Sequence, residues 1–390
     1  MMVNTHKMRG LPHTKEVTMT RLLRFGLDVH TTNYTICVAE PVLGTDPLIL
    51  LNHQVEPDYR MIIDVINKVE EQLGEDEYDI LCGYEAGCLG YSLYHDLVDH
   101  GINCVILAPT TMQVEKGKRI KTDFRDAQLI ATCLCHGGYK AVHIPTWNDD
   151  EVKEYIRMRD DHMLQLKKVK QQINALCTRH GYTYQATKWT EKHLQWLGSL
   201  TFTDVHKETL GEYLITYYYL VNKLETFDRR IEEFAHEKEY EDKVGRLCCL
   251  LGIRTNTAMA LIAETGDFSR FPKGDIYAHY LGLAPGENSS SDKVNRLSIT
   301  KAGNTHLRKL LVETAQSVCR GAVGYKSKAL KARQNGMPGE VIAYADKANE
   351  RFRRKYYRLI NKGKPRNVAV TAIAREMACF IWGLMTDNIA

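Results

Sequence analysis

The chain has 390 residues, a formal net charge of +4 and 44% hydrophobic residues, which is typical of a globular protein with more than one domain. No run approaches the roughly 18 consecutive apolar residues that a membrane span needs, and the first 20 residues lack the apolar core of a secretory signal. We therefore expect a cytoplasmic protein without a membrane partner, in which residues 1–20 form a flexible extension. Most of the 11 cysteines lie in apolar runs, as reduced core cysteines do, and CLCHGG lacks the second ligand pair that a zinc site needs.

Residues 21–148 predict a mixed sheet covered by helices. Three β-rich runs joined by short polar turns come first: LLRFGLDVH, NYTICVAE and DPLILLNHQV. Two more strands, YDILCGYE and NCVILAP, then alternate with helical patterns, and the last of these helices opens at Asp123. The order β-β-β-α-β-α-β-α is that of an RNase H-like fold. Because no Gly-rich turn follows the first strand and no GxxxxGKS/T motif occurs, dinucleotide-binding and P-loop folds are excluded.

Residues 149–240 lose the β signal and predict long helices. Eight apolar residues repeat with alternating spacings of three and four: Leu210, Tyr213, Tyr217, Leu220, Leu224, Phe227, Ile231 and Phe234. This heptad period favours a coiled coil, either as a hairpin within the chain or between subunits, because spacing does not choose the partner. Residues 241–390 predict a mostly helical domain with a serine-rich loop and closing helices interrupted by NKGKPRN. The predicted fold class is therefore α/β plus α.

Four carboxylates stand where this fold brings residues together. Asp28 ends the first strand and Glu85 ends the fourth, which are neighbours in a sheet of this order. Asp123 and Asp126 lie about one turn apart on one face of the adjacent helix. Each has an ordinary alternative, such as capping of the helix by Asp123 or a favourable helix dipole at Asp126. Together, however, four hard oxygen ligands favour Mg²⁺ or Mn²⁺, and a metal pair of this kind serves chemistry at a phosphodiester.

Basic residues cluster in EKGKRIKTDFR, in NERFRRKYYRLINKGKPR and at the start of the helix after the serine-rich loop. Either basic run alone is equally compatible with a solvated helix face, but aromatic residues among the cations of the second run suit a phosphate backbone. The candidate nucleic-acid-binding residues are Lys118, Arg119, Lys121, Arg125, Lys301, Arg308, Lys309, Arg353, Arg354 and Lys364.

Several motifs resemble those of a known family. RFGLDVH, YEAGCLGYSLYHDL, CVILAP and KTDFRDA resemble the RuvC-like DEDD domain of bacterial insertion-sequence transposases, and YLGLAPGENSSSDKVNRLSITKAGNTHLRKLLVE resembles their C-terminal transposase domain. The resemblance implies a nucleoid-associated bacterial recombinase that excises and inserts its own element. It implies double-stranded DNA as substrate, a noncoding bridge RNA as guide, and a homo-oligomer, dimer or tetramer. It also implies that Asp28, Glu85, Asp123 and Asp126 hold the metals.

The same resemblance implies a serine nucleophile five residues after the proline of GLAP, which is Ser290. Ser289 and Ser291 flank it, and this chain has Ser291 and Leu297 where glycine is more usual in the family. In the mechanism that follows, Ser290 attacks the phosphodiester and keeps the bond energy in a phosphoserine link, so no ATP is needed. Without the resemblance, the three serines would read as a flexible polar loop.

Two other functions remain open at this point. A metal-dependent, structure-specific DNA endonuclease such as a junction resolvase would use the same carboxylates with water as the nucleophile. A nucleic-acid-binding scaffold with a decayed site would be expected to lack one or more of these residues, yet all four acids and the serine are present.

Overall fold

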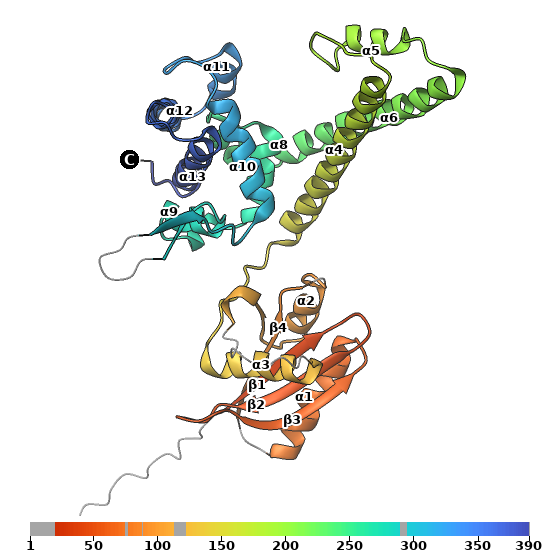
Figure 1. Ribbon diagram of the computed structural model, residues 1–390. Coiled ribbons are helices and arrows are strands. Elements are labelled where there is room, and N and C mark those ends of the chain that lie inside the picture. The colour runs from red at the N-terminus through yellow and green to blue at the C-terminus, as the bar shows by residue number, and fades with distance from the viewer. Residues whose placement is uncertain (1–19, 75–76, 88, 113–121, 289–294, 390) are drawn as a thin grey trace, which may run out of the picture. The chain divides into compact units, whose positions relative to one another are not determined.

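The computed structural model describes residues 20–74, 77–87, 89–112, 122–288 and 295–389. It divides into two compact units, Met1–Ile144 and Pro145–Ala390 (Figure 1). Nearly all of the predicted N-terminal extension lies outside the described residues. So do four of the predicted site residues: Lys118, Arg119, Lys121 and Ser290.

The first unit contains the predicted mixed sheet, and the prediction is confirmed at this level. Its strands are β1 (Arg21–Val29), β2 (Tyr34–Glu40), β3 (Leu48–Val55), β4 (Tyr78–Glu85) and β5 (Cys104–Leu107), in the order β3-β2-β1-β4-β5. Strand β2 is antiparallel to both β1 and β3, whereas β4 runs parallel to both β1 and β5. This order places the carboxyl ends of β1 and β4 side by side.

Helices cover both faces of this sheet. They are α1 (Tyr59–Leu73), α2 (Ser92–Asp99), α3 (Asp123–His136) and the short 3₁₀ helix Pro109–Thr111. Alternate residues of β1, including Phe25 and Leu27, share a hydrophobic core with Ile62 of α1 and Leu97 of α2. The intervening residues of β1 face α3, since a Cβ added at Gly26 would lie 2.3 Å from the backbone oxygen of Ala127. Only a glycine in β1 lets α3 approach this closely.

The second unit begins with two long helices that pack along each other. They are α4 (Trp147–Arg179) and α6 (Asp204–Ala235), with the short α5 (Glu191–Gly198) at their far end (Figure 1). Leu166 and Ile173 of α4 are buried together with Leu210, Leu220 and Leu224 of α6. The apolar stripe of α6 is therefore covered by a helix of the same chain.

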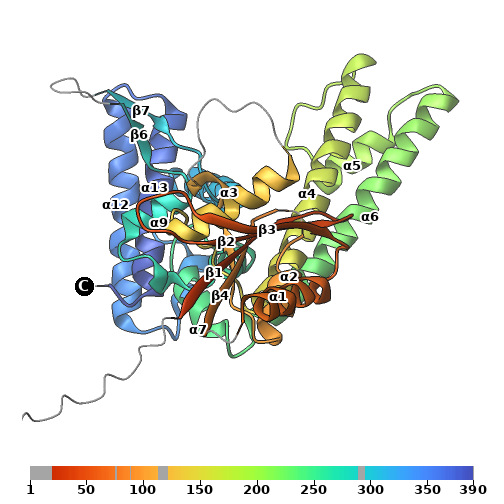
Figure 2. The same ribbon diagram turned by 90° about the horizontal axis from the view of Figure 1, so that it is seen from below.

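The remaining residues form a mostly helical body, as predicted. Its elements are α7 (Glu241–Cys248), α8 (Thr255–Thr265), the 3₁₀ helix Phe268–Arg270, α9 (Gly274–Tyr280), β6 (Pro285–Glu287), β7 (Arg296–Ile299), α10 (Thr305–Val318), α11 (Lys328–Gln334), α12 (Gly339–Asn361) and α13 (Arg366–Met385). Figure 2 shows α12 lying alongside α13. Strands β6 and β7, which flank the serine-rich segment and pair as a hairpin, were not predicted. With three and four residues they are too short to show a clear alternation of apolar and polar residues.

Among the described helices, α13 alone is long and apolar enough to cross a membrane by length and composition. However, 56% of its most apolar window is buried within the protein, and core helices commonly pass the same test. Ile373, Met377 and Ile381 of α13 lie in the hydrophobic core of the second unit. The apolar character of α13 is accounted for by packing.

Candidate active site

Asp28 and Glu85 lie on the same face of the sheet. Gly26 pairs with Gly83 in the parallel β1–β4 ladder, and a Cβ added at either glycine would collide with α3. Side chains two residues further along a strand point to the same face, so Asp28 and Glu85 both project to the α3 side. Adjacent strands are about 4.8 Å apart. Asp28 and Glu85 thus end neighbouring strands, but the exposed Glu85 is not among the groups whose ligand atoms lie within 4.8 Å of Asp28 and Asp123.

The first turn of α3 brings Asp123 to this edge of the sheet. One ligand atom each of Asp28, His30 and Asp123 lies within 4.8 Å of the others. The charge of Asp126 also acts on Asp28 and raises its pKa. The helix is capped by Thr122, whose hydroxyl accepts a hydrogen bond from the backbone amide of Arg125. Asp123 is therefore not the capping residue, and the ordinary explanation for its position does not apply.

Asp28 occupies an electrostatically unfavourable position. Its pKa is raised, first by burial and then by the charges of Asp126 and Asp123, while His30 opposes the shift. Its Oδ2 atom is buried and lacks a well-aligned hydrogen bond among the described residues, and its one close polar neighbour is Nε2 of His30, an ion-pair contact at 3.2 Å. A buried carboxylate oxygen without a donor is destabilising. Carboxylate oxygens gathered in this way are the ligands that divalent cations such as Mg²⁺ prefer.

His30 is a residue of this site that the sequence analysis did not select. It follows Asp28 by two residues, and its side chain is about half exposed (52%). Its presence could have been noticed, because residues separated by two in an extended segment project to the same side. Four carboxylates predict an oxygen-only ligand set, and such a set does not include the imidazole in LDVH.

The serine-rich segment connects β6 to β7. Ser290 itself lies outside the described residues, but both ends of the segment are defined. The backbone amide of Asn288 donates to the carbonyl of Asn295 at 2.9 Å, and Thr300 bonds back to Ala284 at 2.9 Å. The residues that flank the segment on its two sides are therefore paired in one hairpin.

Comparisons with known proteins identify the family of this chain. A profile described as a transposase, of the IS110 DEDD type, matches residues 25–181, and one described as "Transposase IS116/IS110/IS902 family" matches residues 245–330. The putative transposase y4qE of Sinorhizobium fredii is 31% identical over 93% of this chain and 88% of its own length. The transposase for insertion sequence element IS1533 of Leptospira borgpetersenii is 31% identical over 89% of this chain and 99% of its own. The chain belongs to the IS110/IS116 family of insertion-sequence transposases.

The predicted cations of the transposase fall into different environments. Lys301 and Lys309 are exposed, and so are Arg125, Arg354 and Lys364. Arg308 is half-buried and donates a hydrogen bond to the carbonyl of Leu281 at 3.1 Å, so it also supports the fold.

Arg353 does not fit the prediction that it binds nucleic acid. It is only 5% exposed, and its guanidinium donates to four backbone carbonyls: Val318, Arg320, Ala322 and Tyr325. These carbonyls belong to the end of α10 and the turn that follows. Because its donors are used inside the protein, Arg353 holds this turn in place and does not meet a phosphate at the surface.

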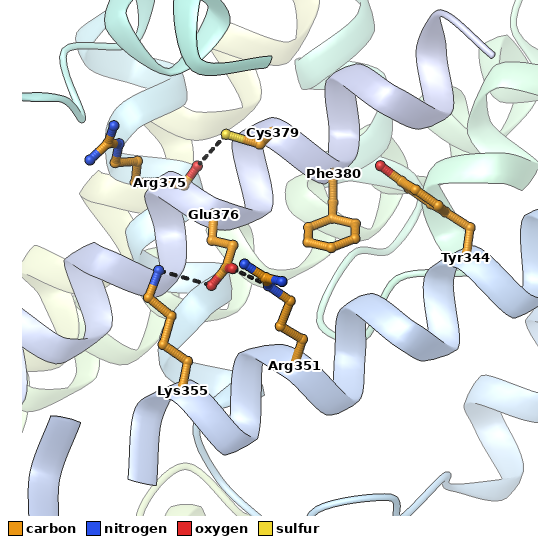
Figure 3. Close-up of a pocket in the computed structure, with 7 residues that line it drawn as sticks. All are labelled: Tyr344, Arg351, Lys355, Arg375, Glu376, Cys379 and Phe380. Atoms are coloured by element: carbon orange, nitrogen blue, oxygen red, sulfur yellow. Dashed lines mark hydrogen bonds and ion pairs between the residues drawn. The ribbon is translucent and has the colours of Figure 1, made fainter. Parts of the chain in front are cut away.

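A different face of α12 presents cations. A groove of about 430 Å³ between α12 and α13 is lined by Tyr344, Arg351, Lys355, Arg375, Glu376, Cys379 and Phe380 (Figure 3). An adjoining hollow of about 260 Å³ adds Arg354 and Arg358. Together these hollows, called here the α12–α13 groove, gather five cations on their walls.

Two carboxylates offset only part of this charge. Glu376 is buried and projects from α13 between Arg351 and Lys355, with the Lys355 ammonium 3.0 Å away (Figure 3). Glu350 pairs with Arg354. The groove of the transposase keeps a net positive charge. The signal in the sequence was the three- and four-residue spacing of Arg351, Arg354, Lys355 and Arg358, which marks one helix face and leaves Arg353 on another.

Proposed function

We propose that this IS110-family transposase cuts and rejoins DNA through a serine nucleophile and a divalent-metal centre. Asp28, Glu85, Asp123 and Asp126 would hold the cations, Mg²⁺ or Mn²⁺. The observation that carries the proposal is the orphaned Oδ2 of Asp28 at the point where β1 meets α3. Bound cations would balance the carboxylates and withdraw charge from the scissile phosphate. His30 would hold the Asp28 carboxylate in place from its outer side.

Ser290 would form the covalent link to DNA. Its Oγ loses a proton and bonds to the phosphorus, while the bond from phosphorus to one sugar oxygen breaks. That sugar oxygen takes up a proton and leaves as a hydroxyl, so charge and atoms balance. The phosphoserine ester stores the energy of the broken bond until another strand's hydroxyl displaces the serine.

Trapping of the covalent intermediate tests this chemistry. With a labelled DNA end and Mg²⁺, the wild type should give a protein–DNA adduct that survives denaturation. The adduct should vanish in Ser290→Ala and persist in Ser289→Ala, which is the matched control. DNA cleavage without any adduct, unaffected by Ser290→Ala, would favour the alternative of a structure-specific endonuclease that uses water.

We also propose that the chain binds nucleic acid through surface cations on both units. In the first unit these are Arg125 and the neighbouring Lys118, Arg119 and Lys121. In the second unit they are Lys301, Arg308, Lys309, Arg354 and Lys364. The net positive charge of the α12–α13 groove supports this, since phosphate contacts dominate nucleic-acid affinity.

A noncoding guide RNA would be the second nucleic-acid partner. Sequencing of the RNA that co-purifies with the protein tests this. One discrete species from the element's own flanks would support guidance, whereas random cellular fragments would show only nonspecific binding by a basic surface.

The regions would divide the work as follows. Residues 21–148 form the RuvC-like DEDD domain, residues 149–240 a coiled-coil region, and residues 241–390 the C-terminal transposase domain. Because recombination joins two duplexes, we expect a homodimer or homotetramer acting in the cytoplasm on the nucleoid. Light scattering with and without DNA measures the assembly.

A further inference from the structure

The ring of His306 lies between carboxylates from two other helices. In the first turn of α10, its Nε2 atom is 2.8 Å from Oδ2 of Asp160 on α4. Its Nδ1 atom is 3.0 Å from Oε1 of Glu264 on α8. The side chain of His306 is 21% exposed and that of Glu264 only 2%. One imidazole therefore joins three helices that are distant in the sequence.

Glu264 is the centre of the network. Besides His306, it accepts two hydrogen bonds from Arg157 of α4, at 2.7 and 3.0 Å, and one from Nδ2 of Asn304 at 2.7 Å. Burial alone would raise its pKa, but these hydrogen bonds outweigh burial and lower the pKa to about 2. Glu264 thus remains ionised throughout the working pH range.

The geometry requires His306 to be charged. A neutral imidazole has one N–H, so one of the two carboxylates would face a lone pair. Hydrogen bonds to Asp160 and Glu264 accordingly raise the pKa of His306 to about 9. The charged groups linked to it by ion pairs come from three other helices: Glu154, Arg157, Arg159 and Asp160 on α4, Asp228 on α6 and Glu264 on α8.

This network adjoins the base of the β6–β7 hairpin. Asn304, which donates to Glu264, also caps α10 and accepts from the amide of Leu307 at 3.0 Å. Only four residues separate it from the end of β7 at Ile299. On the other side of the base, a Cβ at Gly303 would lie 1.9 Å from the carbonyl oxygen of Tyr280. The amide of Lys301 bonds to the carbonyl of Gly282 at 3.1 Å. The base of the hairpin is therefore closely packed and tied directly to the network.

We propose that His306 is a positioning residue that links the serine hairpin to the paired helices α4 and α6. This rests on the proposed role of Ser290. The link runs from Asp160 and Arg157 on α4, through His306 and Glu264, to Asn304 and the hairpin. Figure 1 shows α8 lying against α4, α6 and α10. A displacement of the paired helices is thereby passed to the hairpin that carries the nucleophile.

Two substitutions and one control test the link. His306→Gln keeps the size but loses the charge and one donor, whereas His306→Arg keeps the charge and can reach both carboxylates. His162→Gln is the control, since His162 is a half-buried histidine of α4 that bonds only to the carbonyl of Met158 among described polar groups. At saturating DNA and Mg²⁺, His306→Gln should slow adduct formation at least about 10-fold, because small misplacements of a nucleophile are costly. His306→Arg should recover most of the rate, and His162→Gln should leave it unchanged.

The pH profile supplies a measurement that a merely structural role would not move. In the wild type the adduct rate should fall as pH rises through about 9, where His306 loses its proton. In His306→Arg the rate should not fall there. Hydrogen exchange at the amides of Thr300 and Lys301 should be faster in His306→Gln, whether or not the protein reacts with DNA.

The outcomes are separable. Equal adduct rates in the wild type and His306→Gln would overturn the inference, as would an alkaline fall that persists in His306→Arg. If His306→Gln does not fold, the comparison of the wild type with His306→Arg decides. A wild type that forms no Ser290-dependent adduct would instead refute the proposed function. The hydrogen-exchange comparison would then still report on the link by itself.

Discussion

Replacement of Asp28 by Asn should stabilise the metal-free protein while removing its response to metal. In the structure, Asp28 is buried to 17% side-chain exposure, has an oxygen without a hydrogen-bond donor, and is repelled by Asp123 and Asp126. An unsatisfied buried polar group costs about 1–3 kcal/mol. Asn keeps the shape and removes the charge, so we expect a gain of about 1 kcal/mol in the free energy of unfolding.

Thermal unfolding with and without metal measures both effects. In EDTA, Asp28→Asn should raise the melting temperature of the first unit by about 3–5 °C, the shift that ~1 kcal/mol gives in a domain of this size. With Mg²⁺ at about 100 times its dissociation constant, the wild type should gain about 2.7 kcal/mol and the variant much less. Asp64→Asn, an exposed acid of α1, is the control and should behave as the wild type in both conditions.

Either of two results would refute this reasoning. If Asp28→Asn is less stable than the wild type in EDTA, the ion pair with His30 outweighs the burial of Asp28 and its repulsion by Asp123 and Asp126. If Mg²⁺ stabilises the variant as much as the wild type, Asp28 is not a metal ligand.

Three further predictions follow from single contacts. Gly26→Ala should destabilise the first unit by about 3 kcal/mol in chemical denaturation and weaken its Mg²⁺ response, because the added Cβ meets the backbone of α3 at 2.3 Å; unchanged stability would contradict the close packing. Arg358→Gln should lower the slope of nucleic-acid affinity against salt concentration by about one phosphate contact. Arg353→Gln should leave this slope unchanged. It should instead reduce the free energy of unfolding by about 2–4 kcal/mol, because it breaks hydrogen bonds to buried carbonyls. The stability that His306 supplies should be fully present below pH 6.5 and lost as pH rises through about 9, where its pKa lies. The loss should be at most about 3 kcal/mol. Chemical denaturation at several pH values measures it, and His306→Arg should remove the pH dependence.

Much of the fold was predictable because its signals are local. The period of two in LLRFGLDVH, the heptads of α6 and the polar turns between strands each depend on residues close in the chain. The order of elements then allowed only a small number of sheet arrangements. The β6–β7 hairpin was missed for the opposite reason, because its strands are short and owe their form to packing on the helical body.

The sequence predicted which acids could form the candidate site, but not which groups surround each side chain. Asp28, Glu85 and Asp123 could be selected as strand-end and helix-start acids, and their roles as ligands stay predictions. His30 was not selected, and of the cations that line the α12–α13 groove only Arg354 was selected. The basic run of α12 has almost uniform composition, so only the helix surface separates the buried Arg353 from the exposed Arg354 and Arg358.

The sequence by itself determined which residues could carry charge, where strands and helices run, and the family to which the chain belongs. Only the tertiary structure decided which charges meet: the orphaned oxygen of Asp28 against α3, the inward turn of Arg353, and the imidazole of His306 between Asp160 and Glu264. The physical reason is that periodicity is a property of neighbouring residues, whereas desolvation and ion pairing depend on segments that lie from 28 to 146 positions apart in the chain.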